Sequence, residues 1–341
     1  RKITSGRIMH WLKKIVVGFF VGAVMLSVVF IFLLNLSGTP QHNETGFGVT
    51  FSPFYAEEFG VDWHDAYKAI LDDLGVRYFR LSAYWNSTES QDDEFNFDDL
   101  DFQLDQAALR NAHVLLGVGR KLPRWPECHD PEWVKSLSNN EFDQKLLDYV
   151  TIVVNRYKDH PALSRWQVEN EVLFPFGDCM RPYNLPLLKK EIELVHALDP
   201  NHEVVVTDSG EWTVWLPLAL FGDTLGISMY REAWNDFFNS HIPFPVKEGW
   251  YQFRAKLINP WKKTIIVTEL QAEPWAGKPV EKMGPDESML LMPLDKIKDN
   301  VLFAKNVGFP EVYLWGVEWW YTLREQDFPE IWDGMKDIFS E

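Results

Sequence analysis

Short hydrophobic runs alternate with longer amphipathic stretches along most of the chain, from residue 46 onward. A short apolar run bounded by polar residues is typical of a buried strand, whereas apolar residues that recur at every third or fourth position are typical of a helix. We therefore predict strands at 46–51, 78–81, 113–118, 164–168, 203–207, 224–229, 264–267 and 311–314. The predicted helices are 62–74, 98–112, 141–158, 187–198, 213–221, 249–258, 294–307 and 329–339.

The strand-then-helix unit occurs eight times in succession. This repeat predicts an α/β fold, the (β/α)8 or TIM barrel, with residues 46–341 forming one domain. An open, doubly wound sheet is the alternative. That fold normally carries a glycine-rich phosphate-binding turn after an early strand, and the glycines at 117 and 119 lack the remaining spacing of that motif.

A different hydrophobic pattern precedes the barrel. Residues 15–36 carry no charge and are long enough to cross a bilayer as one helix. Residues 1–14 hold five basic residues and no acidic one: Arg1, Lys2, Arg7, Lys13 and Lys14. The positive-inside rule therefore predicts a single-pass signal-anchor with a cytoplasmic tail at 1–14, a linker at 37–45 and an extracytoplasmic barrel. A cleaved signal peptide, which would leave the barrel secreted, is the alternative.

The composition adds a strong acidic bias. The chain has 33 Lys and Arg against 50 Asp and Glu, a net charge of −17. Such a surface repels nucleic acid and anionic glycans, and it is compatible with a neutral substrate. Cys128 and Cys179 can form a disulfide in an extracytoplasmic domain, whereas a metal site needs more ligands at closer spacing. We expect a monomer without metal or cofactor.

Two of the predicted strands end in a glutamate. The fourth continues into Glu169, Asn170 and Glu171, and the seventh continues through Thr268 into Glu269. Functional residues of a (β/α)8 barrel lie at the C-terminal ends of its strands, so these side chains should meet at the barrel mouth. A pair of carboxyl groups there can cleave a glycosidic bond, one protonating the leaving oxygen and one attacking or activating water. For a single glutamate, solvation of a strand end is the alternative.

Tryptophans gather after the same strand ends. Nine of the sixteen follow predicted strands, namely Trp85, Trp125, Trp133, Trp212, Trp234, Trp275, Trp315, Trp319 and Trp320. Flat aromatic faces stack on the apolar faces of sugar rings, which suggests a carbohydrate cleft. Local cores inside large loops are the alternative, which we expect for about half of them. The candidates for substrate binding are Trp85, Trp125, Trp275, Trp315 and Trp319.

Six residues at predicted strand ends resemble those of the clan A glycoside hydrolases, and most of all the family of endoglucanases and endo-β-mannanases. They are Arg80, Asn170, Glu171, Tyr230, Glu269 and Trp315. The resemblance covers the whole barrel. Its most specific parts are the Trp-x-x-x-Asn-Glu motif that ends at Glu171 and the Thr-Glu pair that ends at Glu269.

The resemblance implies a retaining β-glycosidase that acts by double displacement on a neutral β-linked polysaccharide or oligosaccharide. Glu171 would be the general acid/base and Glu269 the nucleophile. Asn170 would donate a hydrogen bond to the 2-hydroxyl of the sugar, and Trp315 would form the floor beneath the ring that is cleaved.

Two further residues would act on the nucleophile. Arg80 and Tyr230 are expected to keep Glu269 ionised and oriented, because a cation and a hydroxyl donor both favour a carboxylate. A structural ion pair inside the barrel is the alternative for Arg80.

The sequence departs from the family pattern in two places. The family has His two residues before its Tyr, where this chain has Ser228 before Tyr230, and no His ends the third predicted strand. We expect Arg120, Lys121 or His129 to replace these sugar contacts. The sugar and its linkage are therefore not predicted.

Three other carboxylates and two other functions are alternatives to this interpretation. Glu169, Glu273 and Glu318 are possible substrate contacts, with a surface or structural role as the default. A barrel aldolase would need a Lys at an inner strand end and a phosphate loop, and neither is present. A catalytically inactive, membrane-tethered glycan-binding or wall-associated protein is the second alternative, against which the presence of both Glu171 and Glu269 argues.

Overall fold

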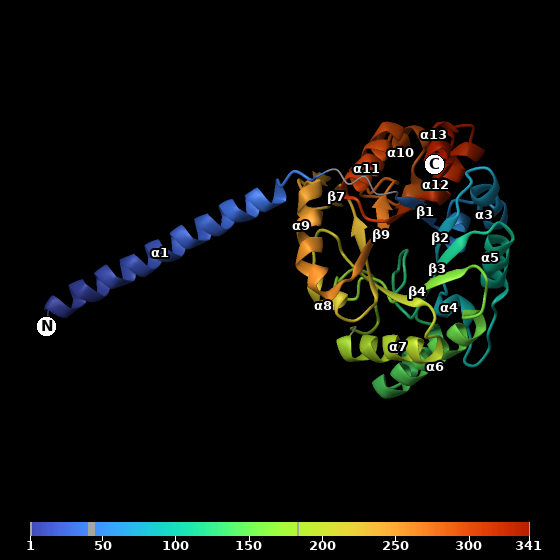
Figure 1. The fold of residues 1–341 in the computed structure, drawn as a ribbon, viewed down its shortest axis with the longest axis horizontal. Helices are drawn as coiled ribbons and strands as arrows, with labels where there is room; N and C mark the ends of the chain where they lie inside the picture. Colours follow the sequence, from blue (N-terminus) through green and yellow to red (C-terminus); the bar gives the residue numbers. More distant parts are fainter. Residues whose placement is uncertain (1, 40–44, 183, 341) are drawn as a thin grey trace.

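The computed structural model describes residues 2–39, 45–182 and 184–340. Its centre is a closed barrel of parallel strands in the order β1-β10-β9-β6-β5-β4-β3-β2 (Figure 1). The strands are β1 (Gly46–Thr50), β2 (Tyr78–Ser82), β3 (His113–Val118), β4 (Leu163–Val168), β5 (Glu203–Asp208), β6 (Thr224–Met229), β9 (Thr264–Gln271) and β10 (Glu311–Trp315). The predicted (β/α)8 fold is confirmed, and each predicted strand corresponds to an observed one.

Helices surround this barrel and follow its strands in sequence (Figure 1). They are α2 (Pro53–Glu58), α3 (Trp63–Asp72), α4 (Trp85–Thr88), α5 (Asp98–Leu109), α6 (Asn139–Tyr157), α7 (Leu185–Leu198), α8 (Leu216–Ala219), α9 (Glu248–Ile258), α10 (Pro285–Leu291), α11 (Leu294–Val307), α12 (Val317–Glu325) and α13 (Glu330–Ser340). The helix predicted at 213–221 is wrong in extent. Pro217 fits only the first turn of a helix, so α8 begins at Leu216 and is short.

The amphipathic pattern explains how the helices attach to the barrel. Helix α6 starts at a capping box in which Ser138 and Glu141 each bond to the backbone amide of the other. Its buried side chains recur at helical spacing: Phe142, Leu146, Tyr149, Val150, Val153, Val154 and Tyr157. On the inner side of the strands, a separate buried layer fills the barrel with Leu115, Val205, Ile266 and Tyr313.

A hairpin after β6 was not predicted from the sequence. Strands β7 (Glu232–Asn235) and β8 (Ser240–Pro243) pair in antiparallel fashion. Both are short and only partly buried, so neither contains the apolar run by which the barrel strands were recognised.

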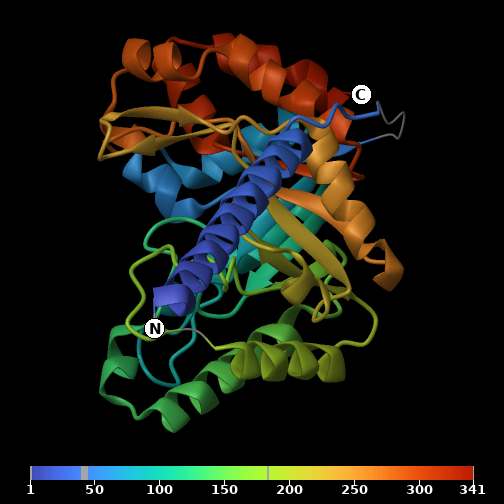
Figure 2. The same ribbon diagram turned by 90° about the vertical axis from the view of Figure 1, so that its left-hand side faces the viewer.

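The N-terminal helix α1 (Lys2–Leu34) extends away from the barrel (Figure 1) and lies in front of it in the view of Figure 2. Its segment Lys14–Leu34 is long and apolar enough to cross a membrane, a criterion that signal sequences and buried core helices also meet. Residues 40–44 of the predicted linker lie outside the described residues.

Candidate active site

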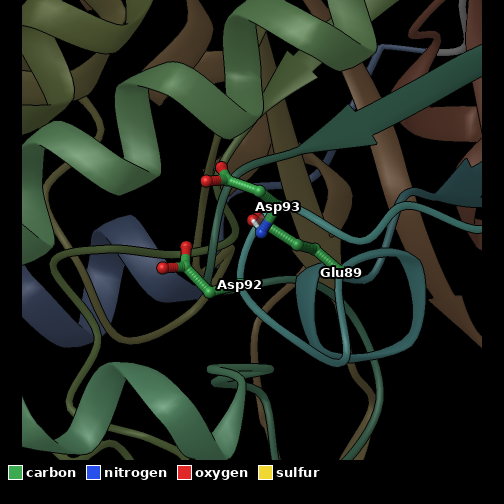
Figure 3. Close-up of side chains that lie close together, drawn as sticks. All are labelled: Glu89, Asp92 and Asp93. Atoms are coloured by element: carbon green, nitrogen blue, oxygen red, sulfur yellow. Dashed lines mark hydrogen bonds between the residues drawn. The ribbon is translucent and has the colours of Figure 1, made fainter.

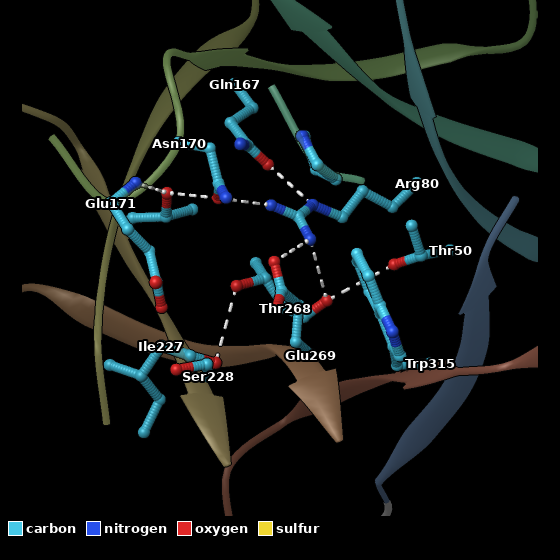
Figure 4. Close-up of polar contacts among 12 residues, drawn as sticks. Thr50, Arg80, Gln167, Asn170, Glu171, Ile227, Ser228, Thr268, Glu269 and Trp315 are labelled. Atoms are coloured by element: carbon cyan, nitrogen blue, oxygen red, sulfur yellow. Dashed lines mark hydrogen bonds and ion pairs between the residues drawn. The ribbon is translucent and has the colours of Figure 1, made fainter. Parts of the chain in front are cut away.

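A buried arginine links the strands that carry the two candidate glutamates (Figure 4). Arg80 on β2 donates from Nη1 to Glu269 Oε1 at 2.7 Å and from Nη2 to Asn170 Oδ1 at 2.8 Å. Its Nε donates to Gln167 Oε1, also at 2.7 Å. One planar guanidinium therefore fixes the position of β9 relative to the end of β4. The structural ion pair that was considered for Arg80 is present, and it lies on the candidate nucleophile.

Glu269 lies inside β9, not at its end, because that strand continues to Gln271. The register of β9 shifts between Val267 and Leu270 against both neighbouring strands, β6 and β10. A bulge of this kind re-aims a side chain relative to a regular strand. Tyr230 Oη donates to Glu269 Oε2 at 3.2 Å, so each oxygen of the carboxylate has its own donor.

The backbone is left-handed at two glutamates after β4, with φ of 61° at Glu169 and 42° at Glu171. Non-glycine residues adopt this conformation when the surroundings hold them in it, and such strain is concentrated at functional sites. The carboxylate of Glu169 accepts hydrogen bonds from the amides of Arg120 at 2.8 Å and Lys121 at 2.6 Å. A Cβ at Gly119 would lie 2.3 Å from this carboxylate. Glu169 is therefore a structural residue that holds the β3 loop, and the idea that it contacts substrate is not supported.

Thr207 at the end of β5 orients the next two residues. Its hydroxyl donates to Asn170 Oδ1 at 3.0 Å and accepts a hydrogen bond from the Glu171 amide at 2.9 Å. Since Arg80 donates to the same Asn170 oxygen, the amide cannot turn over without losing both bonds. The Nδ2 group of Asn170 is thus the end left for other contacts.

Glu171 is placed to hold a proton. Burial raises its pKa well above the usual range, and the charges of Glu269 and Glu127 raise the pKa further, while the Ser228 hydroxyl and Lys121 lower it. Its Oε1 is buried and has no hydrogen-bond partner among the described residues. A carboxyl group that stays protonated at neutral pH can act as a general acid. Ser228, which stands where the family pattern has His, therefore lowers the pKa of the candidate acid/base.

Glu127 is a third carboxyl group of the site, and the sequence analysis missed it. Its Oε2 accepts a hydrogen bond from Asn170 Nδ2 at 3.1 Å. Burial, followed by the charge of Glu269, raises the pKa of Glu127 to about 8. Its backbone is also left-handed, with φ of 71°. The only signal in the sequence is the run Pro-Arg-Trp-Pro-Glu-Cys, in which two prolines, a tryptophan and a cysteine lie close together without a regular periodicity.

A disulfide joins Cys128, next to Glu127, to Cys179, and their Cα atoms are 5.1 Å apart. The predicted pairing is confirmed in the structure. The bond connects the loop after β3 to the loop after β4, where the Asp178 amide also donates to Pro126 O at 2.9 Å. The two loops that carry Glu127 and Glu171 are therefore fastened to each other.

Two of the candidate tryptophans lie in the core, so their assignment to substrate binding is wrong. Trp85 is fully buried, donates to Glu89 Oε2 and stacks on Tyr149 with ring centroids 5.5 Å apart. Trp319 is also buried and donates to Ser288 Oγ at 3.2 Å. Both follow strand ends, but each lies on a helix and packs against another one, Trp85 on α6 and Trp319 on α10. They therefore belong to local cores, which is the alternative considered from the sequence.

Two other tryptophans remain accessible and form a row of rings. Trp275 packs edge-on against Tyr230, with centroids 5.1 Å apart, and lies near Phe176. Phe176 in turn contacts Trp125, which is 62% exposed. The row begins at Tyr230, the hydrogen-bond donor to Glu269, and therefore runs outward from the candidate nucleophile.

Trp315, at the end of β10, is held by a buried ion network. Its Nε1 donates to Glu273 Oε1 at 2.7 Å, and the Arg124 guanidinium lies 3.9 Å from the centre of its ring. Arg124 also pairs with Glu273 at 2.7 Å and Glu318 at 2.6 Å. Burial raises the pKa of Glu318 to about 7. These two glutamates therefore support Trp315 from inside the protein, and neither is a surface group.

The three residues expected to replace the missing family contacts have structural partners instead. Arg120 is buried and pairs with both carboxylate oxygens of Asp130, at 2.8 and 2.5 Å. Lys121 Nζ donates to the carbonyl oxygens of Glu171 and Phe174, each at 3.0 Å. His129 is buried as well, and burial lowers its pKa to about 4. The expectation that they contact sugar is not supported.

Glu89, Asp92 and Asp93 are the one group among the described residues whose side-chain oxygens are close enough for a shared metal ion (Figure 3). Each of these three carboxylates already has a hydrogen-bond or ion-pair partner. Lys145 pairs with Asp92 at 2.6 Å and Asp93 at 3.2 Å, and Glu89 accepts from Trp85 Nε1 and from the Asp93 amide. These contacts account for the cluster as a salt-bridged turn, and we assign it no metal.

Comparison with known proteins gives one partial family match. Residues 77–185 match the model described as Glycosyl hydrolase family 10. The matched segment includes Arg80, Glu127, Asn170 and Glu171 but ends before Glu269. That family differs from the endoglucanases and endo-β-mannanases named above but belongs to the same clan. No curated protein matches the chain in sequence.

Solved structures of glycosidases share the fold at low sequence identity. A β-galactosidase from Halorubrum lacusprofundi aligns with a TM-score of 0.55 at 14% identity, over 79% of this chain and 52% of its own. An endo-1,4-β-xylanase from Caldicellulosiruptor owensensis aligns with a TM-score of 0.53 at 16% identity, over 80% and 85%. An intracellular xylanase from Thermoanaerobacterium saccharolyticum aligns with a TM-score of 0.55 at 17% identity, over 83% of this chain and 90% of its own.

This chain spans about half the length of the β-galactosidases that it matches. The xylanases, in contrast, are covered over most of their length. The chain is thus similar to the clan A (β/α)8 glycoside hydrolases, and the comparisons support a glycoside hydrolase.

Proposed function

We propose that this protein is a retaining β-glycosidase that hydrolyses a neutral β-linked polysaccharide or oligosaccharide by double displacement. The observation that supports it best is the contrast between two carboxyl groups of one site. Arg80 and Tyr230 donate to the two oxygens of Glu269, whereas burial and neighbouring carboxylates favour the protonated form of Glu171. One group is thus prepared to attack and the other to donate a proton.

In the first step, a Glu269 oxygen attacks the anomeric carbon while Glu171 gives its proton to the glycosidic oxygen. The bond to the leaving sugar breaks, and an ester forms between Glu269 and the retained sugar. Asn170 Nδ2 has a second hydrogen, besides the one given to Glu127, for the 2-hydroxyl of that sugar.

In the second step, water attacks the ester and Glu171 takes a proton from it. Esterification removes the negative charge of Glu269, which is one of the causes of the raised pKa of Glu171. The pKa of Glu171 therefore falls when it has to act as a base. Hydrolysis restores both carboxyl groups and leaves a product with the original anomeric configuration.

The aromatic residues are proposed to bind the rest of the substrate. Trp315 would lie beneath the reacting sugar, and Trp275, Phe176 and Trp125 would contact further sugars outward from the mouth. Stacking on these rings needs no charge, which agrees with a neutral substrate in a strongly acidic protein.

Hydrolysis of a substrate panel tests the proposal. The panel contains aryl β-glycosides, β-glucans, mannans and galactans, with xylans added because of the similarity to xylanases. We expect release of reducing ends from at least one member, and none from the Glu269→Ala variant. Binding to a member without any hydrolysis would instead favour the inactive glycan-binding alternative.

The location of the barrel is a separate part of the proposal. We propose that residues 15–36 anchor the protein in a membrane, that residues 1–14 face the cytoplasm, and that the barrel lies outside. The charge pattern and the apolar segment Lys14–Leu34 support this. Protease added to intact cells should remove the barrel; protection until lysis would show the opposite orientation, and a shortened mature N-terminus would show cleavage.

A further inference from the structure

The chain contacts the barrel directly after the apolar helix α1 ends. After α1 ends at Leu34, the Lys247 amide donates to Leu34 O at 3.0 Å and the Gly249 amide donates to Leu36 O at 3.1 Å. These two amides belong to the start of α9. A Cβ at Gly249 would lie 2.4 Å from Leu36 O, so only glycine allows this approach.

The barrel surface around α9, toward the end of the helix opposite to this junction, exposes large apolar side chains. Helices α8 and α9 pack against each other, and the turn η2 (Asn259–Trp261) follows α9. Leu216, Leu220, Leu257 and Trp261 on these elements are 38%, 52%, 57% and 45% exposed. In Figure 1, α8 and α9 lie on the side of the barrel from which α1 projects, and α9 runs across the direction of α1.

The same surface carries basic residues in an acidic protein. Lys256 and Lys262 are exposed on α9 and directly after η2. Glu248 is the one acidic residue in α8, α9 and η2, and it is half-buried. The whole chain has a net charge of −17, whereas the exposed charged residues of α8, α9 and the turn that follows are basic.

We propose that this α8–α9 face, formed by Leu216, Leu220, Leu257, Trp261, Lys256 and Lys262, lies against the anionic headgroups of the bilayer in which α1 is anchored. The inference rests on the proposed anchoring by α1. Leucine and tryptophan side chains enter the headgroup boundary, and lysines are attracted to anionic lipid.

The short connection favours the bilayer over a protein partner as the occupant. Only Asn35 separates the end of α1 from the docked Leu36, and one residue spans at most about 3.6 Å. The barrel therefore cannot stand away from the membrane surface while these hydrogen bonds hold. Its α8–α9 face is the side that such a tether presents to the lipid.

A single-cysteine experiment on the full chain in lipid nanodiscs tests the proposal. Both native cysteines are in the disulfide, so Leu257→Cys provides a single site for an environment-sensitive fluorophore. Leu109→Cys is the matched control, since Leu109 is 73% exposed on α5, on the opposite side of the barrel (Figure 1). Lipids with a spin label near the headgroup then act as the quencher.

We expect quenching at position 257 and none at position 109. The quenching should be stronger with anionic than with zwitterionic lipid, and Lys256→Glu with Lys262→Glu should reduce it by about twofold or more. If α1 resists carbonate extraction but position 257 is not quenched, the proposed membrane-facing surface is wrong while the proposed anchoring by α1 is supported. If carbonate extracts the protein, the proposed anchor and the proposed surface are both wrong. If position 257 is not quenched and its fluorescence changes instead with protein concentration, a second copy covers the face, which also overturns the proposal.

Discussion

Arg80 and Glu269 form an ion pair inside the barrel, with Nη1 and Oε1 2.7 Å apart and the arginine side chain fully buried. The pair joins β2 to the bulged part of β9, which is the third strand from β2 around the closed barrel. Since the same guanidinium also holds Asn170, stability and catalytic geometry depend on one side chain.

Replacing this arginine should therefore destabilise the protein strongly. Arg80→Ala leaves Glu269 buried without its cation, and we expect a loss of about 3–5 kcal/mol in the free energy of unfolding. Urea denaturation measures this. Arg110→Ala is the matched control, because Arg110 pairs with the exposed Asp72 and should cost about 0–1 kcal/mol. Equal losses in the two variants would show that the buried pair has no special role.

The cluster of Glu127, Glu171 and Glu269 should determine the pH dependence of activity. The pKa of Glu127 is about 8, so above that pH Glu127 carries a negative charge that raises the pKa of Glu171, and Glu127→Gln removes this charge. Glu171 would then lose its proton at lower pH, so the basic limb of the kcat/KM profile should move to lower pH. Asp208→Asn changes another buried carboxyl group, whose pKa burial raises to about 6, and should leave that limb in place. A basic limb that does not move, or moves upward, in Glu127→Gln would contradict the assignment.

The disulfide should stabilise the loops around the acid/base. Cys128 and Cys179 are separated by 51 residues, and closing a loop of this length contributes about 2–4 kcal/mol. We expect Cys179→Ser to lower the free energy of unfolding by this amount and to reduce activity, since Glu127 is adjacent to Cys128. Reductant should have the same effect on the unmodified protein and no effect on the variant. A reductant effect on the variant would point to another cause.

The accessible rings should affect long substrates more than short ones. Trp125→Ala removes an exposed side chain, so folding should be unchanged, while KM for a polysaccharide should rise about two- to tenfold at unchanged kcat. An aryl monosaccharide should show no change. Trp212→Ala, with a similar exposure but outside the row of rings, is the control. An equal rise in KM for Trp212→Ala would argue against a specific row.

The sequence predicted the barrel because each strand contributes an apolar run, such as that at Thr264–Gln271, and because these runs alternate with amphipathic helices. It located Arg80, Glu171 and Glu269 because charged residues within or directly after short apolar runs are conspicuous. It could not reveal the bulge before Glu269, since that depends on the register of two neighbouring strands.

Other features depend on the path of loops, which leaves no period in the sequence. Glu127 reaches the site through a loop with left-handed residues and a disulfide, and Trp85 and Trp319 turn inward although they follow strand ends. A position directly after a strand therefore predicts that the residue lies near the barrel mouth. Whether its side chain points into the mouth or into the core is set by tertiary packing.

The most direct test of the central claim is the configuration of the glycosyl azides formed by two alanine variants. With an activated aryl β-glycoside and azide, Glu269→Ala lacks the nucleophile, so azide should attack from its side and give the α-glycosyl azide. Glu171→Ala retains the nucleophile and should give the β-glycosyl azide through the ester intermediate. Proton NMR of the products distinguishes the two. The reverse configurations, or near-normal activity of either variant without azide, would contradict the assignment of Glu269 as nucleophile and Glu171 as acid/base.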